Sequence, residues 1–504
     1  MNLKYLGINN NSKSFIVFLI IFFIHLFCIN LYPINDEFIF PVGAKLLETG
    51  NVNIIKNFFT FNANTLGFSG LIFLFSKFIP LSFYYIGKLL SCSGIILIFI
   101  GINNLLKILK IDLNRNSHLL ILLILLNPII FTFSFRATPD FFSAALSFFS
   151  ITCFIINKRF LLKLLFLTLF SIAVIIKPFN AIMIFLIFYN FNFNFKKSFC
   201  KKNIILFLWF LASLFIPVIF LIYNFYLFNF FLIPEQYKLI KSVNFLNFFI
   251  SFISYLGFLN LFILPLYIDY CFNILKRNTL KTIFYILISV AASLLFMDAA
   301  GEINFGFLQA FLNYDLFYFI LVFSFCILFD FIYFFINQNN SFKKIFLFFI
   351  LFALIFIFIL SNFLPSQRYL LIILPLFLST FFIITKNNFL CTLTISLYIL
   401  INSILFLNHY SMSHNIKNVI IFLEKNKLIQ ETNPAFLGQH ALNYFIDFNK
   451  DKNNFMNIDV LLDKNKKYYV SDIEPKNKMN ILFISTSHNI FKKNRNLFVL
   501  KNNF

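Results

Sequence analysis

The sequence predicts a polytopic α-helical membrane protein with about thirteen transmembrane helices, followed by a small C-terminal α/β domain outside the membrane. Two observations predict this class. Of the 504 residues, 60% are hydrophobic and only 12% are charged, which is more apolar surface than the core of a water-soluble protein can bury. Apolar runs of roughly 17–25 residues also recur along the chain, and helices of that length cross a hydrocarbon layer about 30 Å thick.

The predicted spans follow the apolar runs in order. The first run, from Phe15 to Leu31, is followed by Tyr-Pro and acidic residues where a signal peptide would have a small-residue cleavage site. We therefore expect a retained first span and no cleavable signal peptide. The thirteen spans are expected near 14–32, 83–106, 117–135, 140–157, 160–176, 179–195, 203–228, 248–275, 281–297, 312–336, 343–363, 369–385 and 389–408.

The charges of the predicted loops alternate along the chain. One set of loops has Asp112 as its only acid and carries Lys4, Lys13, Lys107, Lys110, Arg115, Lys158, Arg159, Lys163, Lys196, Lys197, Lys201, Lys202, Lys276, Arg277, Lys281, Lys343, Lys344 and Lys386. The opposite set carries Asp36, Glu37, Glu48, Asp140, Glu235, Asp298, Glu302 and Asp315. Because cytoplasmic loops are rich in Lys and Arg, we expect a multi-pass membrane protein whose N-terminus is cytoplasmic and whose C-terminus, after thirteen crossings, is periplasmic or extracellular.

Two polar segments interrupt this pattern, so we expect a transmembrane domain over 1–408 and an extracytoplasmic domain over 409–504. Residues 33–80 form a long first external loop, in which the apolar spacing from Phe38 to Leu47 predicts an amphipathic surface helix that stops at Gly50. A second helix is expected from Leu71 to Phe78. The tail predicts a helix through 416–423 and strands at 468–470, 481–484 and 497–500.

Composition argues against several other classes of protein. The net charge of +22 comes from basic residues placed between apolar runs, which indicates topology and not nucleic-acid binding. The seven cysteines all lie in or beside apolar runs, so no disulfide framework is expected. His409 and His414 are five residues apart and fall on different helix faces, which predicts no metal site. No cofactor is expected either.

Acidic residues on the predicted outer side are the candidate catalytic groups. Asp36 and Glu37 directly follow the first span, and Asp140 follows Arg136 after the third. An acid beside the bilayer can act as a general base over a lipid-borne substrate, and ordinary solvated loop charge is the alternative. Arg136 and Asp140, four residues apart, are expected to pair if both lie on a helix, so a structural pair and an active-site role both stay open for them.

Basic residues at the predicted outer ends of spans are the candidate phosphate ligands. Lys88, Lys177 and Arg368 share this position. Arginine suits bidentate contact with phosphate, whereas lysine acts as a point charge. The alternative is that these side chains extend to the lipid headgroups, as basic residues at helix ends commonly do.

Five short segments resemble the GT-C glycosyltransferases, above all glycosyltransferase family 39, the protein O-mannosyltransferase and lipid A aminoarabinose transferase group. They occur in the family's order and on one predicted membrane face. The segments are Asn35-Asp36-Glu37-Phe38 with the following 44–51, Tyr84 to Ser91 around Lys88, Asn127-Pro128 to Arg136-Ala137-Thr138-Pro139-Asp140, Lys177-Pro178, and Ser366-Gln367-Arg368-Tyr369-Leu370 with Pro375. The resemblance covers roughly the first 190 residues and 365–420.

This resemblance implies an inverting transfer of a sugar from a polyprenyl-phosphate donor to a hydroxyl acceptor, which is a protein, a lipid or a glycan. It makes Asp36 the base, Glu37 a residue that orients the acceptor or supports Asp36, and Asp140 a second acid of the active site. It assigns the lipid phosphate to Lys88, Arg136, Lys177, Arg368 and Tyr369. Family 39 generally uses no metal, and none is expected.

Three alternatives are considered. An O-antigen polymerase or ligase would usually place its long outer loop late in the chain. A lipid-linked glycan flippase or transporter would show charges midway along spans and an inverted repeat. A scaffold relative would keep the fold without the chemistry, which the intact Asp36-Glu37 pair disfavours.

Overall fold

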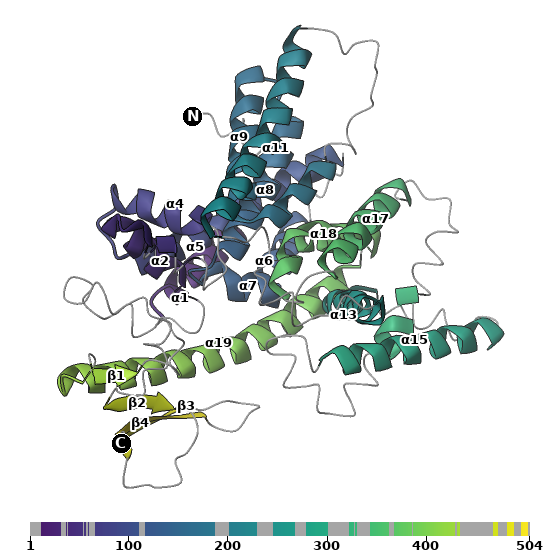
Figure 1. The fold of residues 1–504 in the computed structure, drawn as a ribbon. Coiled ribbons are helices and arrows are strands. Elements are labelled where there is room, and N and C mark those ends of the chain that lie inside the picture. The colour runs from purple at the N-terminus through teal and green to yellow at the C-terminus, as the bar shows by residue number, and fades with distance from the viewer. Residues whose placement is uncertain are drawn as a thin grey trace.

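The computed structural model (Figure 1) describes residues 12–31, 37, 39–53, 55–56, 59, 66–109, 116–186, 201–228, 245–267, 279–300, 322–326, 328–329, 343–361, 367–385, 387–428, 431–433, 467–471, 481–487 and 495–501. Most of these residues are helical. The α-helices are α1 (Ser12–Cys28), α2 (Ile39–Thr49), α4 (Leu66–Ser76), α5 (Phe83–Ile108), α6 (Ser117–Leu125), α7 (Pro128–Ser134), α8 (Pro139–Ile156), α9 (Phe160–Ile176), α11 (Lys201–Phe228), α13 (Phe245–Ile263), α15 (Thr279–Ala300), α17 (Lys343–Leu360), α18 (Leu374–Thr385) and α19 (Asn388–Lys425). Short 3-10 helices are η3 (Pro178–Ile184), η5 (Leu264–Tyr267) and η7 (Gln367–Ile372).

Several of these helices could cross a membrane. Within the described residues, α5, α8 and α19 are long and apolar enough, and the bent pair α6–α7 would make a fourth span. Further apolar helices of 10–17 residues include α4, α9 and parts of α11, α13, α15, α17 and α18. A helical chain with apolar helices that could span a membrane agrees with the expected class, and the count of about thirteen stays a prediction.

The run predicted as one span near 117–135 consists of two helices, α6 and α7, that are bent by 65° relative to each other. The bend falls at Leu126 and Asn127, directly before Pro128. Proline has no N–H to continue the helical hydrogen bonds. The Asn127 side chain instead caps α7 by accepting a hydrogen bond from the Ile129 amide at 3.1 Å.

Helices α5 and α8 pack closely because glycines recur every seven residues on one face of α5. A methyl group added at Gly87 would lie 3.1 Å from the Ala137 side chain, and one added at Gly101 would lie 2.6 Å from the Phe148 ring. The missing side chains therefore let α8 and the residues just before it approach α5. This contact matters for the site, because α5 carries Lys88 and α8 begins beside Asp140.

Enlarging the middle glycine of this face is expected to destabilise the protein. A Cβ at Gly94 would come within 2.8 Å of the Phe141 ring, so Gly94→Val is expected to lower the free energy of unfolding by about 1–3 kcal/mol. Thermal unfolding in detergent measures the loss. Gly70→Val is the matched control, because a Cβ at Gly70 meets nothing within 4 Å. Equal losses in both variants would contradict the close packing of α5 on α8.

The helix predicted after the acidic pair is confirmed. Helix α2 spans Ile39–Thr49, and Gly50 follows it with a φ of +65°, a conformation that favours glycine at a helix C-terminus. Its buried residues include Val42, Ala44 and Leu46, which lie on more than one side of the helix, so α2 packs into the protein. The second predicted helix, expected at 71–78, begins earlier, as α4 over Leu66–Ser76.

The tail forms a four-stranded sheet at the C-terminal end of α19 (Figure 1). The strands are β1 (Thr432–Asn433), β2 (Tyr468–Ser471), β3 (Ile481–Ser487) and β4 (Arg495–Lys501), in the order β1-β2-β4-β3. Strands β2, β4 and β3 pair antiparallel, and β1 pairs parallel with β2. The three predicted strand segments lie within β2, β3 and β4.

One hydrophobic cluster joins this sheet to α19 and to the first loop. It contains Val42 and Leu46 of α2, Phe59, Ile416, Val419, Ile420 and Leu423 of α19, and Val470, Leu497 and Val499 of the sheet. The predicted helix through 416–423 is therefore part of α19, which runs without a break through the expected domain boundary at 408/409. The sheet packs on the helical body through these contacts.

Candidate functional site

Two buried carboxylates organise the predicted site residues into two groups. Glu37 lies between α1 and α2, and Asp140 lies in the first turn of α8. Both side chains are almost completely shielded from solvent. We define the Glu37 cluster as Glu37, Tyr84, Lys88, Arg136 and His409, and the Asp140 cluster as Asp140, Lys177, Arg368 and Tyr369.

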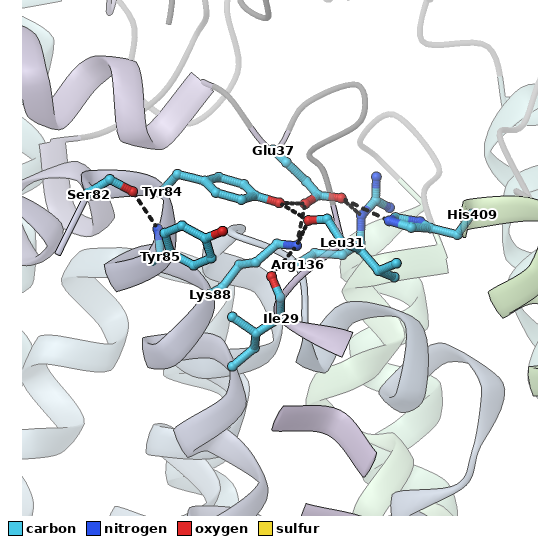
Figure 2. A network of polar contacts seen from close by, with 9 residues as sticks. All are labelled: Ile29, Leu31, Glu37, Ser82, Tyr84, Tyr85, Lys88, Arg136 and His409. Atoms are coloured by element: carbon cyan, nitrogen blue, oxygen red, sulfur yellow. Dashed lines mark hydrogen bonds and ion pairs between the residues drawn. The ribbon is translucent and has the colours of Figure 1, made fainter. Parts of the chain in front are cut away.

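Each oxygen of the Glu37 carboxylate has two polar neighbours (Figure 2). The Tyr84 hydroxyl donates a hydrogen bond to Oε2 at 3.1 Å, and the Lys88 ammonium lies 3.9 Å from the same oxygen. Arg136 donates from Nε to Oε1 at 3.0 Å, and Nε2 of His409 lies 3.7 Å from Oε1. A carboxylate this deeply buried is stable in charged form only with such partners.

Lys88 points entirely toward protein groups. Its ammonium donates hydrogen bonds to the backbone oxygens of Ile29 at 3.1 Å and Leu31 at 2.6 Å, besides its ion pair with Glu37. It also lies 4.7 Å from the centre of the Tyr84 ring. Lys88 therefore ties the segment after α1 to α5 and holds Glu37, and in this structure it does not face an external ligand.

The Asp140 carboxylate is held by two cations from distant parts of the chain. Oδ1 contacts the Lys177 ammonium and lies 3.9 Å from Nε of Arg368. Both cations lie over the Tyr369 ring, at 4.4 Å for Lys177 and 5.7 Å for Arg368. An acid in the first turn of α8 is also favoured by the positive end of the helix dipole.

Electrostatics at Lys177 combines opposing influences. Burial is the main influence that lowers the pKa of Lys177 well below its usual value, and the positive charge of Arg368 lowers it further. The contact with the Asp140 carboxylate favours the charged ammonium instead. An additional anion beside Lys177 and Arg368 would relieve the repulsion between these two cations.

The structure does not pair Arg136 with Asp140, which was one of the two possibilities that the sequence left open for them. Arg136 lies before α8, which begins at Pro139, so the two residues are not one helical turn apart. The Thr138 amide donates to the Arg136 carbonyl at 2.8 Å in the turn between them. Arg136 pairs with Glu37 and Asp140 pairs with Lys177, and this short segment joins the two clusters.

The structure gathers most of the predicted residues and adds two. Glu37, Lys88 and Arg136 meet in one cluster, and Asp140, Lys177, Arg368 and Tyr369 meet in the other. Asp36 lies outside the described residues. Sequence reasoning did not assign Tyr84 or His409 to the site. The signal for Tyr84 was its position four residues before Lys88, on the same helix face. The signal for His409 was a polar residue seven positions after Asn402, on one face of a long apolar helix.

Cations outnumber carboxylates two to one in each cluster. Arg136, Lys177 and Arg368 keep 15%, 14% and 34% of their side chains exposed, whereas the two acids are buried behind them. Exposed donors with surplus positive charge suit an anion, and arginine suits phosphate in particular.

Within the described residues, no group of three or more His, Cys, Asp and Glu side chains is arranged to hold a metal ion. Known proteins offer no further guide to the ligand of the two clusters. No family model, no characterised protein and no solved structure matches this sequence.

Proposed function

We propose that this chain is a membrane glycosyltransferase that moves a sugar from a polyprenyl-phosphate donor to a hydroxyl group on the outer face of the membrane. One observation carries the proposal. Three partly exposed cations gather around two buried carboxylates, beside helices apolar enough to hold a lipid tail. The resemblance of the same segments to family 39 supports it, and the acceptor class is a protein, a lipid or a glycan.

The reaction divides between a base and the cations. The base takes the proton of the acceptor hydroxyl while its oxygen attacks the anomeric carbon of the sugar. The bond between that carbon and the phosphate oxygen breaks, and its electron pair leaves with the lipid phosphate. Arg136, Lys177 and Arg368 stabilise the negative charge that grows on the phosphate, and attack opposite to the leaving phosphate inverts the sugar.

The acids have separate roles in this proposal. Asp36 is the base, as its place after the first predicted span and the resemblance to family 39 imply. Glu37 and Asp140 hold the cations, since each is buried and in contact with at least one of them. Tyr369 supports Lys177 and Arg368 through its ring.

The proposed site faces outward from a bacterial-type inner membrane. The alternation of basic and acidic loops supports a cytoplasmic N-terminus and an outer face that carries Asp36 and Asp140. The C-terminal sheet would then lie on the same outer face as the site. The partners implied are the lipid-linked donor and its acceptor, with no nucleic acid.

A lipid-linked glycan transporter is the second candidate, and the bend between α6 and α7 favours it. At the bend, the Asn402 amide donates to the Leu126 carbonyl at 2.8 Å. Broken helices with polar contacts at membrane depth are typical of transporter binding sites. A transporter would move the labelled lipid between leaflets without transferring its sugar.

The test is sugar transfer by membranes supplied with a panel of labelled polyprenyl-phosphate sugars. Wild type is expected to transfer or hydrolyse at least one donor, and Asp36→Asn to lose this activity at unchanged expression, because the amide cannot accept the proton. Glu48→Gln is the control, since Glu48 is exposed in the same predicted loop. Turnover that is indifferent to Asp36 would contradict the assigned base, and labelled lipid that moves without turnover would favour the transporter.

A further inference from the structure

We infer that His409 is a positioning residue of the Glu37 cluster. Its imidazole holds the Glu37 carboxylate where Arg136 can both pair with Glu37 and face an anionic ligand. The identity of that ligand as a lipid phosphate rests on the proposed function. The contact between His409 and Glu37 does not.

The geometry directs the imidazole at a single polar atom. Nε2 of His409 lies 3.7 Å from Oε1 of Glu37 (Figure 2) and has no hydrogen-bond partner within the described residues. The ring is buried and meets the Phe135 ring edge-on, with 5.4 Å between centroids. Because Phe135 directly precedes Arg136, the same backbone segment orients the imidazole and supplies the guanidinium.

The charges around His409 favour the neutral form of its imidazole, which still carries one N–H. The charged and titratable groups that face it are Glu37, Lys88 and Arg136, with Tyr84 on the far carboxylate oxygen. Two cations against one carboxylate oppose a further positive charge on the ring. In a neutral imidazole with its proton on Nε2, that nitrogen lies 3.7 Å from Oε1, the oxygen that Arg136 also contacts, which is a polar contact longer than a hydrogen bond.

Contacts on both sides fix His409 along α19. Upstream, the Tyr398 hydroxyl donates to the Phe262 carbonyl at 2.6 Å, and Asn402 donates to Leu126. Downstream, Ile416 and Leu423 pack with α2 and the sheet. Since α2 begins two residues after Glu37, the C-terminal sheet helps to hold both partners of the contact in place.

Another buried histidine shows the difference from ordinary packing. Nδ1 of His25 lies 2.8 Å from the Ile21 carbonyl, one turn earlier in its own helix, so this nitrogen is satisfied locally, and Nε2 of His25 has no carboxylate partner within the described residues. The polar neighbour of His409 is instead a carboxylate 372 positions away in the sequence. If His409 only filled space, an apolar side chain of similar size could replace it. The Glu37 carboxylate would then have one polar contact fewer.

Rescue by a conservative variant tests the role of the nitrogen. Full-length protein in detergent is titrated with undecaprenyl phosphate as the probe. His409→Leu is expected to weaken binding by roughly tenfold, because the buried carboxylate of Glu37 loses its polar contact with the imidazole. His409→Gln can still donate a hydrogen bond and should bind within about threefold of wild type. His414→Leu, on the exposed face of the same helix, should leave binding unchanged. Equal losses for Gln and Leu, or no loss for either, would overturn the inference.

A double-mutant cycle tests the contact without any lipid. Glu37→Asp keeps the charge but withdraws the carboxylate by one methylene. If His409 contacts Glu37, the fall in Tm caused by His409→Leu should be smaller in the Glu37→Asp background. His414→Leu should cost the same in both backgrounds. Additive Tm shifts for His409 and Glu37 would overturn the inference, whereas a coupled pair in a protein that binds no undecaprenyl phosphate would overturn only the proposed function.

Discussion

Glu37→Gln is expected to lower the free energy of unfolding by about 3–5 kcal/mol, the cost of removing one partner from a buried ion pair. The variant leaves Lys88 fully buried without its counter-charge, and it removes the charged acceptor of Arg136 at 3.0 Å. The amide keeps the shape of the side chain, so the effect comes from charge and not from a cavity. Thermal unfolding of the purified protein in detergent measures it.

The chain supplies a matched control for this prediction. Glu48 and Lys77 form a second Glu–Lys pair at 3.4 Å, but both side chains are exposed. An exposed ion pair contributes about 0–1 kcal/mol, so Glu48→Gln should change stability little. If the two variants lose similar stability, Glu37 is not the buried centre of a charge cluster.

Arg368→Gln is expected to weaken binding of undecaprenyl phosphate by roughly 10- to 150-fold, which corresponds to about 1.5–3 kcal/mol for a hydrogen bond to a charged group. Arg368 is the most exposed cation of the two clusters, and Lys177 remains in contact with Asp140. The loss should therefore fall on affinity, with little change in Tm. Titration of the full-length protein in detergent measures both.

Two further variants sharpen this result. Arg368→Lys should recover only part of the affinity, because lysine keeps the charge but loses the planar, bidentate donor geometry. Arg159→Gln should bind as wild type, since Arg159 is exposed at the opposite end of α9 from Lys177. Unchanged affinity in Arg368→Gln would remove Arg368 from the phosphate site.

The partner of Arg136 could not be predicted from the sequence. A spacing of four residues predicted a pair with Asp140 only if both residues lay on one helix, and proline at position 139 starts the helix after Arg136. The partner of Arg136 is Glu37, 99 positions away. Helical spacing predicts contacts only when both residues lie on the same helix, and the start of α8 decides that question here.

The bent pair α6–α7 is a second feature that the sequence predicts only in part. Hydropathy averaged over the run near 117–135 is high throughout, so the run was predicted as one span. Asn127-Pro128 is a visible signal for a helix start, with a capping residue followed by proline. The contact that satisfies the free carbonyl at the bend, from Asn402 to Leu126, joins residues 276 positions apart and could not be predicted.

The sequence by itself determined the helical, apolar class, the stop of α2 at Gly50, the strand segments of the tail and the residue types of the site. These features depend on local composition and periodicity, which a chain carries in its order of residues. Only the tertiary structure decided that Glu37 meets Tyr84, Arg136 and His409, that Lys88 faces inward, and that α19 joins the sheet to the site. The physical reason is that buried charges are stabilised by whichever partners packing brings within reach, and packing depends on the whole chain.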